Sequence, residues 1–144
     1  MDQYDALKLD NQLCFPLYAA AREVIKRYRP HLDALQLTYT QYIVLMVLWE
    51  QHQISVRDLG KKLYLDSGTL TPVLKSLEAK ALIHRSRSAA DERVVNVQIT
   101  QEGEALRERA ISVPQQVGQC IPLSSEEAQT LHALLYKVLA GMEG

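Results

Sequence analysis

An alternation of apolar and polar side chains over residues 82–99 is the feature that most constrains how this chain folds. The strings LIHRSR (82–87) and RVVNVQIT (93–100) flank the polar segment SAADE (88–92). Because successive side chains of a strand point to opposite faces, this pattern predicts a β-hairpin with an exposed tip. Almost every other segment has helical spacing, so the hairpin must pack beside helices in a mainly α fold.

Two short helices are predicted immediately before this hairpin. The string SVRD resembles a helix start with Ser55 as its cap, and a second helix follows the turn LYLDSG over TLTPVLKSLEAKAL (69–82). Pro72 removes one backbone hydrogen bond from a helix interior. Either Thr71 caps a helix that starts at Pro72, or the helix begins earlier, at Ser67, and tolerates the ring. The second interpretation is favoured.

Helical patterns also occupy both ends of the chain. A stripe of apolar residues from Leu13 to Tyr28 predicts a helix with one buried face, which Pro30 should end because proline disfavours helical geometry in the preceding residue. Thr38 and Gln41 form a capping-box pattern before the apolar string YIVLMVLW, a predicted buried helix. Further helices are predicted from Thr100 to Val113, with Pro114 and Gly118 as bends, and from the capping-box pattern of Ser124 and Glu127 onward.

The order helix, turn, helix, hairpin predicts a winged helix-turn-helix in a mainly α chain. We expect one domain over residues 1–144, with a DNA-binding lobe at about 53–99 and dimerisation helices at about 5–35 and 100–143. The terminal helices carry more apolar surface than one small domain covers, which favours a helical dimer interface.

Composition narrows the compartment and the chemistry. The sequence has 144 residues, 47% of them apolar, but no apolar run of roughly 20 residues that could cross a bilayer. The acidic start MDQYDALKLD lacks a signal-peptide profile, so a cytoplasmic protein without membrane contact is expected. The two cysteines, Cys14 and Cys120, and four scattered histidines suggest no metal site. No phosphate loop or catalytic triad stands out, so we expect neither a cofactor nor an enzyme.

The net charge of −1 hides an uneven distribution. Residues 57–93 hold eight basic and five acidic side chains. A helix fits the major groove of B-DNA, and an arginine-bearing hairpin tip fits the minor groove. Operator DNA is therefore the expected partner, although a helix-hairpin unit with a merely polar surface remains an alternative. The expected DNA-binding residues are Ser67, Thr69, Thr71 and Lys75 on the second helix and Arg85, Arg87, Asp91 and Arg93 in the wing, where Asp91 would hold Arg93 by a charge-assisted hydrogen bond.

Specific strings add a family resemblance. The order of elements and the wing DERVVNVQIT (91–100) resemble the MarR family of dimeric bacterial transcription regulators. LDNQLCFPLYAA (9–20) and YLDSGTLTPVLKSLE (64–78) are similar to the organic hydroperoxide resistance regulators within that family. The resemblance covers nearly the whole chain.

The resemblance implies a homodimeric repressor with organic hydroperoxides as inducers. Cys14 would be the oxidised residue, held by Tyr28 and Tyr39 of the dimer mate. In the two-cysteine subclass, a second cysteine matched in placement by Cys120 forms a disulfide with the first, here across the two subunits. A thiolate attacks the peroxide, and a helix N-terminus and hydrogen-bond donors favour that charged form. The resulting sulfenic acid condenses with a second thiol.

Two departures from the family pattern concern Pro16 and Ser76. Pro16 follows the reactive position and could bend the helix start, and Ser76 occupies a position where a basic residue would strengthen DNA contact. Three rival functions remain: a MarR-type repressor released by a small phenolic ligand, a thiol peroxidase using both cysteines, and a helical interaction module without DNA binding.

Overall fold

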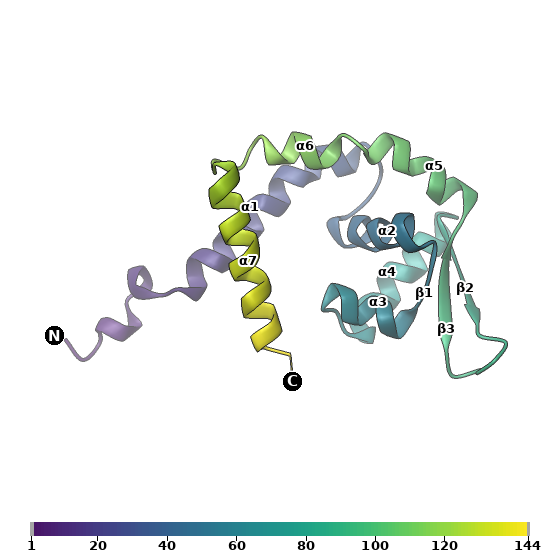
Figure 1. The fold of residues 1–144 in the computed structure, drawn as a ribbon, viewed down its shortest axis with the longest axis horizontal. Coiled ribbons are helices and arrows are strands. Elements are labelled where there is room, and N and C mark those ends of the chain that lie inside the picture. Colours follow the sequence, from purple (N-terminus) through teal and green to yellow (C-terminus); the bar gives the residue numbers. More distant parts are fainter. Residues whose placement is uncertain (1, 144) are drawn as a thin grey trace.

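The computed structural model describes residues 2–143 as a mainly helical chain with one small sheet (Figure 1). The elements in chain order are η1 (Asp5–Leu7), η2 (Leu9–Asn11), α1 (Cys14–Asp33), α2 (Tyr39–Gln51), β1 (Gln53–Ser55), α3 (Val56–Leu63), α4 (Ser67–Ala79), β2 (Ile83–Arg87), β3 (Val95–Ile99), α5 (Gln101–Ala110), α6 (Val113–Gly118) and α7 (Ser125–Gly141). The mainly α, winged helix-turn-helix fold is confirmed, with α3 and α4 as the two short helices and β2 and β3 as the hairpin.

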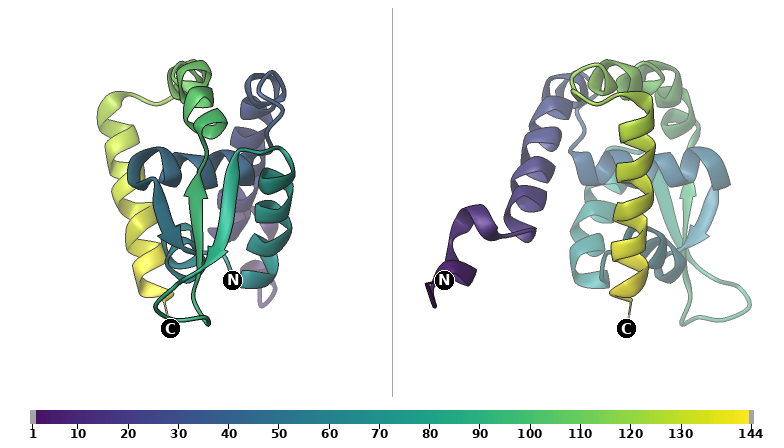
Figure 2. Two further views of the ribbon diagram at one scale, coloured as in Figure 1. Left: turned by 90° about the vertical axis from the view of Figure 1, so that its right-hand side faces the viewer. Right: turned by 60° about the vertical axis from the view of Figure 1, so that its left-hand side comes forward.

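The sheet has the strand order β1-β3-β2 and is antiparallel throughout. Val97 of the central strand lies opposite both Ile54 of β1 and Arg85 of β2. Sequence patterning missed β1, because three residues are too few to show an alternation. Figure 2 shows the strands side by side at one end of the molecule, with the β2–β3 loop extending beyond the helices.

Side-chain caps fix where most of the helices begin. In five cases an oxygen of the capping residue accepts a hydrogen bond from the backbone N–H three residues on: Thr38, Ser55, Asp66, Thr100 and Ser124. Both predicted capping boxes, completed by Gln41 and Glu127, are present. The Asp66 cap starts α4 at Ser67 and leaves Pro72 inside the helix, as the favoured interpretation had it.

Pro30 does not end α1, contrary to the sequence-based expectation, because the helix continues to Asp33. A proline near the end of a helix removes one backbone hydrogen bond, which the remaining turns tolerate here. The chain instead leaves the helix at Gln36, whose φ of 58° is left-handed, and the N–H of Leu37 bonds to the carbonyl of Leu32. This arrangement is a left-handed C-terminal cap.

Pro16 and Pro114 lie in first turns. Pro114 does not bend a continuous helix, because α5 ends at Ala110 and Pro114 then lies at the start of α6. Pro16 lies in the first turn of α1, which begins at Cys14. At both sites the missing N–H has no helical partner to lose, so neither proline strains its helix.

The core lies between Leu32 and Val117, and it packs α2, α3, α4 and the sheet against α5 and α6. In the described part of the chain, α7 buries no residue and α1 buries only Leu32. The apolar stripe predicted to be a buried face of α1 is largely exposed within one chain, with Leu13 at 84%. The N-terminal end of α1 projects away from α6 (Figures 1 and 2). Both terminal helices therefore present apolar faces that their own chain does not cover.

Candidate nucleic-acid interface and thiol site

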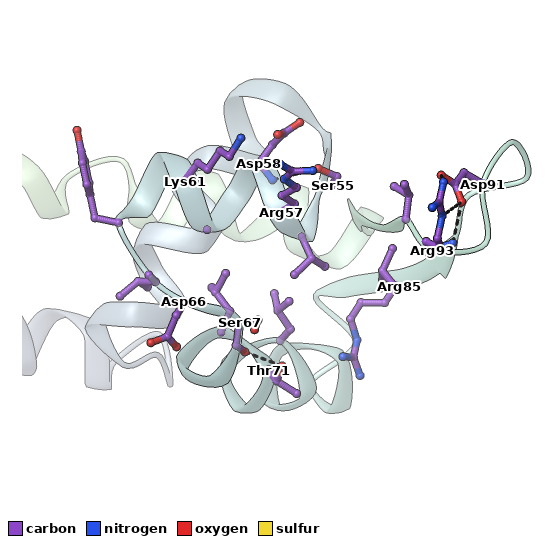
Figure 3. Close-up of a pocket in the computed structure, with 18 of the residues that line it drawn as sticks. Ser55, Arg57, Asp58, Lys61, Asp66, Ser67, Thr71, Arg85, Asp91 and Arg93 are labelled. Atoms are coloured by element: carbon purple, nitrogen blue, oxygen red, sulfur yellow. Dashed lines mark hydrogen bonds and ion pairs between the residues drawn. The ribbon is translucent and has the colours of Figure 1, made fainter. Parts of the chain in front are cut away.

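An open groove of about 1860 Å³ separates α3, α4 and the wing. Figure 3 shows its labelled side chains approaching from these three sides. Five of the predicted DNA-binding residues line it: Ser67, Thr71, Arg85, Asp91 and Arg93. Arg57 and Lys61 of α3 line it as well. Both belong to the positive charges of residues 57–93, but neither was predicted to bind DNA, because no motif distinguishes an α3 cation that faces a groove from a solvated one.

Arg93 is fixed at the tip of the wing by Asp91. The guanidinium donates two hydrogen bonds to the carboxylate, and the backbone N–H of Arg93 donates a third. These bonds lower the pKa of Asp91, so the carboxylate stays charged. The Arg93 side chain is nevertheless 91% exposed, and it presents a positioned cation to solvent. Arg87 donates instead to the backbone carbonyl of Glu92, at 2.8 Å, and ties the loop together.

Arg85 joins the wing to α4. Its Nη2 lies 3.0 Å from Oε1 of Glu78, and its backbone N–H donates to Oε2 of the same carboxylate. Hydrogen bonds from Arg85 lower the pKa of Glu78. Arg85 lines the groove, but its charge is paired, so it positions the hairpin against α4. Glu78 was not predicted to have this role, because nothing in a local pattern relates a residue of α4 to one of β2.

The exposed face of α4 carries the predicted Ser67, Thr69, Thr71 and Lys75. The hydroxyl of Thr71 donates to the backbone carbonyl of Ser67 at 2.7 Å, so its oxygen remains free to accept a bond from outside. Thr69, Lys75 and Arg87 do not line the groove, and the two α4 residues among them lie on the exposed surface beside it.

The side chain of Ser76 is directed toward α2, at a position where the sequence suggested that a basic residue would strengthen DNA contact. Its half-buried hydroxyl accepts a hydrogen bond from Nε2 of Gln41 at 2.8 Å. Oε1 of the buried Gln41 accepts from Nζ of Lys80 and from the backbone N–H of Thr38. Ser76 therefore belongs to a polar network that holds α4 against α2.

Both thiols are free and exposed. Cys14 is the first residue of α1, and Leu13 before it supplies no side-chain cap. The backbone N–H groups of this first turn therefore receive no hydrogen bond acceptor from the capping residue. Cys120 lies just beyond α6, where its Sγ approaches the carbonyl of Gln116 at 3.7 Å.

The predicted tyrosine pair is assembled within one chain. The rings of Tyr28 in α1 and Tyr39 in α2 lie 4.9 Å apart, and both rings approach the buried Tyr42. Burial raises the pKa of Tyr28 and of Tyr39, so both phenols keep their protons at neutral pH and can donate to an anion. Tyr18 lies on the exposed surface, with the guanidinium of Arg22 over its ring.

The thiol and the phenols of one chain do not meet along α1. Cys14 and Tyr28 are 14 positions apart on the same helix, which is about 21 Å of axial rise. A complete thiol–tyrosine site therefore requires a second chain.

Comparison with known proteins places this arrangement in a family. Residues 23–109 match the model of the transcriptional regulators SarA/Rot. The organic hydroperoxide resistance transcriptional regulator of Bacillus subtilis (strain 168) is 46% identical over 138 residues, which cover 96% of this chain and 94% of that protein. This chain belongs to the organic hydroperoxide resistance regulators of the MarR family.

Two structures of the Staphylococcus epidermidis protein AbfR extend the comparison, each 31% identical to this regulator. Reduced AbfR bound to DNA superposes with a TM-score of 0.79 and covers 99% of this chain and 100% of that one. Disulfide-formed AbfR superposes with a TM-score of 0.68 and covers 98% of this chain and 97% of that one. This chain therefore superposes more closely on the DNA-bound AbfR structure than on the disulfide-formed one.

The similarity to these relatives shows that this chain is a DNA-binding transcriptional regulator and not an enzyme. The thiol peroxidase interpretation is therefore excluded. None of the helices formed by residues 2–143 is long and apolar enough to cross a membrane.

Proposed function

We propose that this regulator is a homodimeric repressor that binds operator DNA through α4 and the wing. It dissociates from the operator when an organic hydroperoxide oxidises Cys14. The observation that carries the proposal is the separation of Cys14 from Tyr28 along an α1 helix whose apolar side is uncovered. A second copy of the chain would cover that side and bring its own tyrosine pair to the thiol.

The exposed apolar residues support the dimer. They are concentrated on the terminal helices rather than on the central lobe: Leu13, Phe15, Leu17 and Ile25 on or next to α1, and Leu131, Leu134, Tyr136 and Val138 on α7. The 17-residue helix α7 has no buried residue, so few packing contacts would stabilise it on a monomer. Two such chains packed through these helices would also set two recognition helices at a fixed spacing, as a two-fold operator requires.

The chemistry begins with the Cys14 thiolate. It attacks the terminal peroxide oxygen, so an S–O bond forms while the O–O bond breaks, and the alkoxide leaves as the alcohol after taking a proton. The partner's Tyr28 and the partner's Tyr39 donate O–H bonds to the sulfur and favour its anionic form. Cys14 is then a sulfenic acid, and attack by the thiol of Cys120 expels water and leaves a disulfide.

The disulfide would change the geometry of the dimer. The Cα atoms must come within about 7 Å, yet the start of α1 projects away from the α6 of its own chain (Figure 1). Cys14 therefore pairs with the partner's Cys120. Because α6 follows α5 and α5 follows β3, pulling the residues after α6 would displace the wing. The lower TM-score against disulfide-formed AbfR, at equal identity, is consistent with a movement of this kind in a relative.

A gel-shift series tests the proposal. Double-stranded DNA from the region upstream of the regulator's own gene is incubated with the protein, then with cumene hydroperoxide, then with dithiothreitol. We expect a shifted band that disappears and returns. Cys14→Ser should keep the band in peroxide, and Cys120→Ser should keep it too, because it cannot form the intersubunit disulfide that a non-reducing gel detects in the wild-type protein. A wild-type band that persists in the presence of peroxide would exclude the redox switch.

A second candidate function is release by a small phenolic ligand. A cavity of about 240 Å³ beside α2 is lined by Tyr42, Met46, Trp49 and Arg107, among others. Its apolar wall with one guanidinium would suit an aromatic ring that bears an anionic oxygen. Under this alternative, salicylate would release DNA from Cys14→Ser as readily as from the wild-type protein.

A further inference from the structure

Gly68 is a glycine that the folded chain itself does not need. It lies in the first turn of α4, is exposed and has no left-handed φ. A Cβ built there would meet only Oδ1 of Asp66, at an ordinary 3.4 Å. Gly60 and Gly103 differ, because a Cβ on either would collide with a backbone oxygen, at 2.7 and 2.3 Å. Glycine is a poor helix former, so its place in α4 calls for a reason outside the chain.

The position of Gly68 on α4 indicates that reason. At about 100° per residue, Gly68 and Lys75 point away from the core-facing side that Leu70 and Leu74 occupy. Pro72, four residues after Gly68, has no N–H and cannot donate to the Gly68 carbonyl, its regular helical partner. The outward face of α4 therefore carries bare backbone at Gly68, whose carbonyl lacks its regular helical donor, two turns from the cation of Lys75.

We propose that Gly68 is the point of closest approach between α4 and the operator. Its missing side chain lets the helix backbone lie against the edge of a base pair in the major groove. The Gly68 carbonyl then accepts a hydrogen bond from the amino group of cytosine or adenine, the two donors that bases present there. This inference rests on the proposed DNA-binding face, and it adds a backbone contact to the side-chain contacts assigned above.

The Gly68→Ala variant tests the inference, because stability and binding should change in opposite directions. Alanine is the better helix former, so the midpoint of thermal unfolding should rise by about 3 °C. Affinity for the upstream DNA fragment should fall about tenfold or more, because the added methyl group separates the backbone from the base edge. The salt dependence of binding should keep its slope, since no charge is lost. Gly118→Ala is the matched control: a Cβ there meets nothing within 4 Å, and affinity should not change.

Each outcome bears on the inference. A Gly68→Ala protein that is more stable and binds as tightly as wild type would overturn it, since the methyl group would then be accommodated. A less stable variant would also overturn it, because the glycine would then serve the fold. If the wild-type chain fails to bind the fragment, the proposed function fails and this inference fails with it. Loss of affinity in a stabilised variant supports it.

Discussion

The carboxylate of Asp91 holds the guanidinium of Arg93 at two points, Nε to Oδ1 and Nη2 to Oδ2, each at 3.1 Å. A third bond, from the backbone N–H of Arg93, fixes the same carboxylate to the loop. The acid therefore pre-orients a cation that is itself almost fully exposed. An acidic residue at the tip of a wing that is proposed to bind DNA is unfavourable by charge alone, but here it orients an arginine.

Replacing Asp91 separates the effect of its charge from its effect on Arg93, because the two would change DNA affinity in opposite directions. If charge alone mattered, Asp91→Ala would bind DNA more tightly, because a repulsive carboxylate is gone. If orientation of Arg93 matters, affinity should fall about three- to tenfold, since a flexible guanidinium loses conformational freedom on binding. Fluorescence anisotropy with labelled upstream DNA measures the change. Glu92→Ala is the control, because only the backbone carbonyl of Glu92 is used, by Arg87, and it should bind as tightly as wild type or tighter. Tighter binding by Asp91→Ala would reject the orienting role.

The tyrosine pair should control the rate of oxidation rather than DNA affinity. Tyr28→Phe and Tyr39→Phe keep the ring packing but remove the two O–H donors that the proposed function sets beside the sulfur of the partner's Cys14. We expect oxidation by cumene hydroperoxide to slow about tenfold or more, with unchanged affinity of the reduced protein for DNA. Stopped-flow detection of the sulfenic acid measures the rate. Equal rates in wild type and in the double variant would remove the phenols from the mechanism.

The contrast between α4 and α1 shows how much the sequence alone could predict. Caps, apolar spacing and the hairpin alternation are local signals, and they located α3, α4, β2 and β3 correctly. The hydrogen bond from Arg93 to Asp91 was also predictable, because only two positions separate them. The bond between Gln41 and Ser76 was not, since 35 positions separate the partners. The exposure of α1 was not predicted either, because its apolar stripe indicated a buried face and the chain itself leaves that stripe largely exposed.

Ser76 offers a test of this long-range contact. Ser76→Arg adds a positive charge to α4, yet it should not strengthen DNA binding, because position 76 faces Gln41. The larger side chain breaks the polar network and should lower the free energy of unfolding by about 1–3 kcal/mol. Urea denaturation and anisotropy measure the two quantities. Ala79→Arg adds the same charge at an exposed position of the same helix and should leave stability nearly unchanged. A tighter complex with Ser76→Arg at full stability would show that the position faces DNA after all.

Burial of Tyr42 predicts a loss of stability at alkaline pH. Desolvation raises the pKa of this phenol from 10.0 to about 12, and the neighbouring Tyr28 and Tyr39 contribute to the rise. Between these two values the unfolded chain loses the proton while the folded chain keeps it. The free energy of unfolding should therefore be unaffected by this group below pH 10 and fall as pH rises toward 12, by on the order of 2 kcal/mol.

Denaturant unfolding at fixed protein concentration, repeated from pH 8 to pH 11.5, measures this fall. Tyr42→Phe keeps the buried ring but has no proton to lose, so its stability should decline less steeply over the same range. Tyr18→Phe removes a phenol from the exposed surface and should retain the wild-type profile. Parallel profiles for wild type and Tyr42→Phe would mean that the phenol ionises as easily in the folded chain as in the unfolded one. The ring cluster that joins α1 to α2 would then be open to water, and the burial that raises the pKa of Tyr28 and Tyr39 would be absent with it.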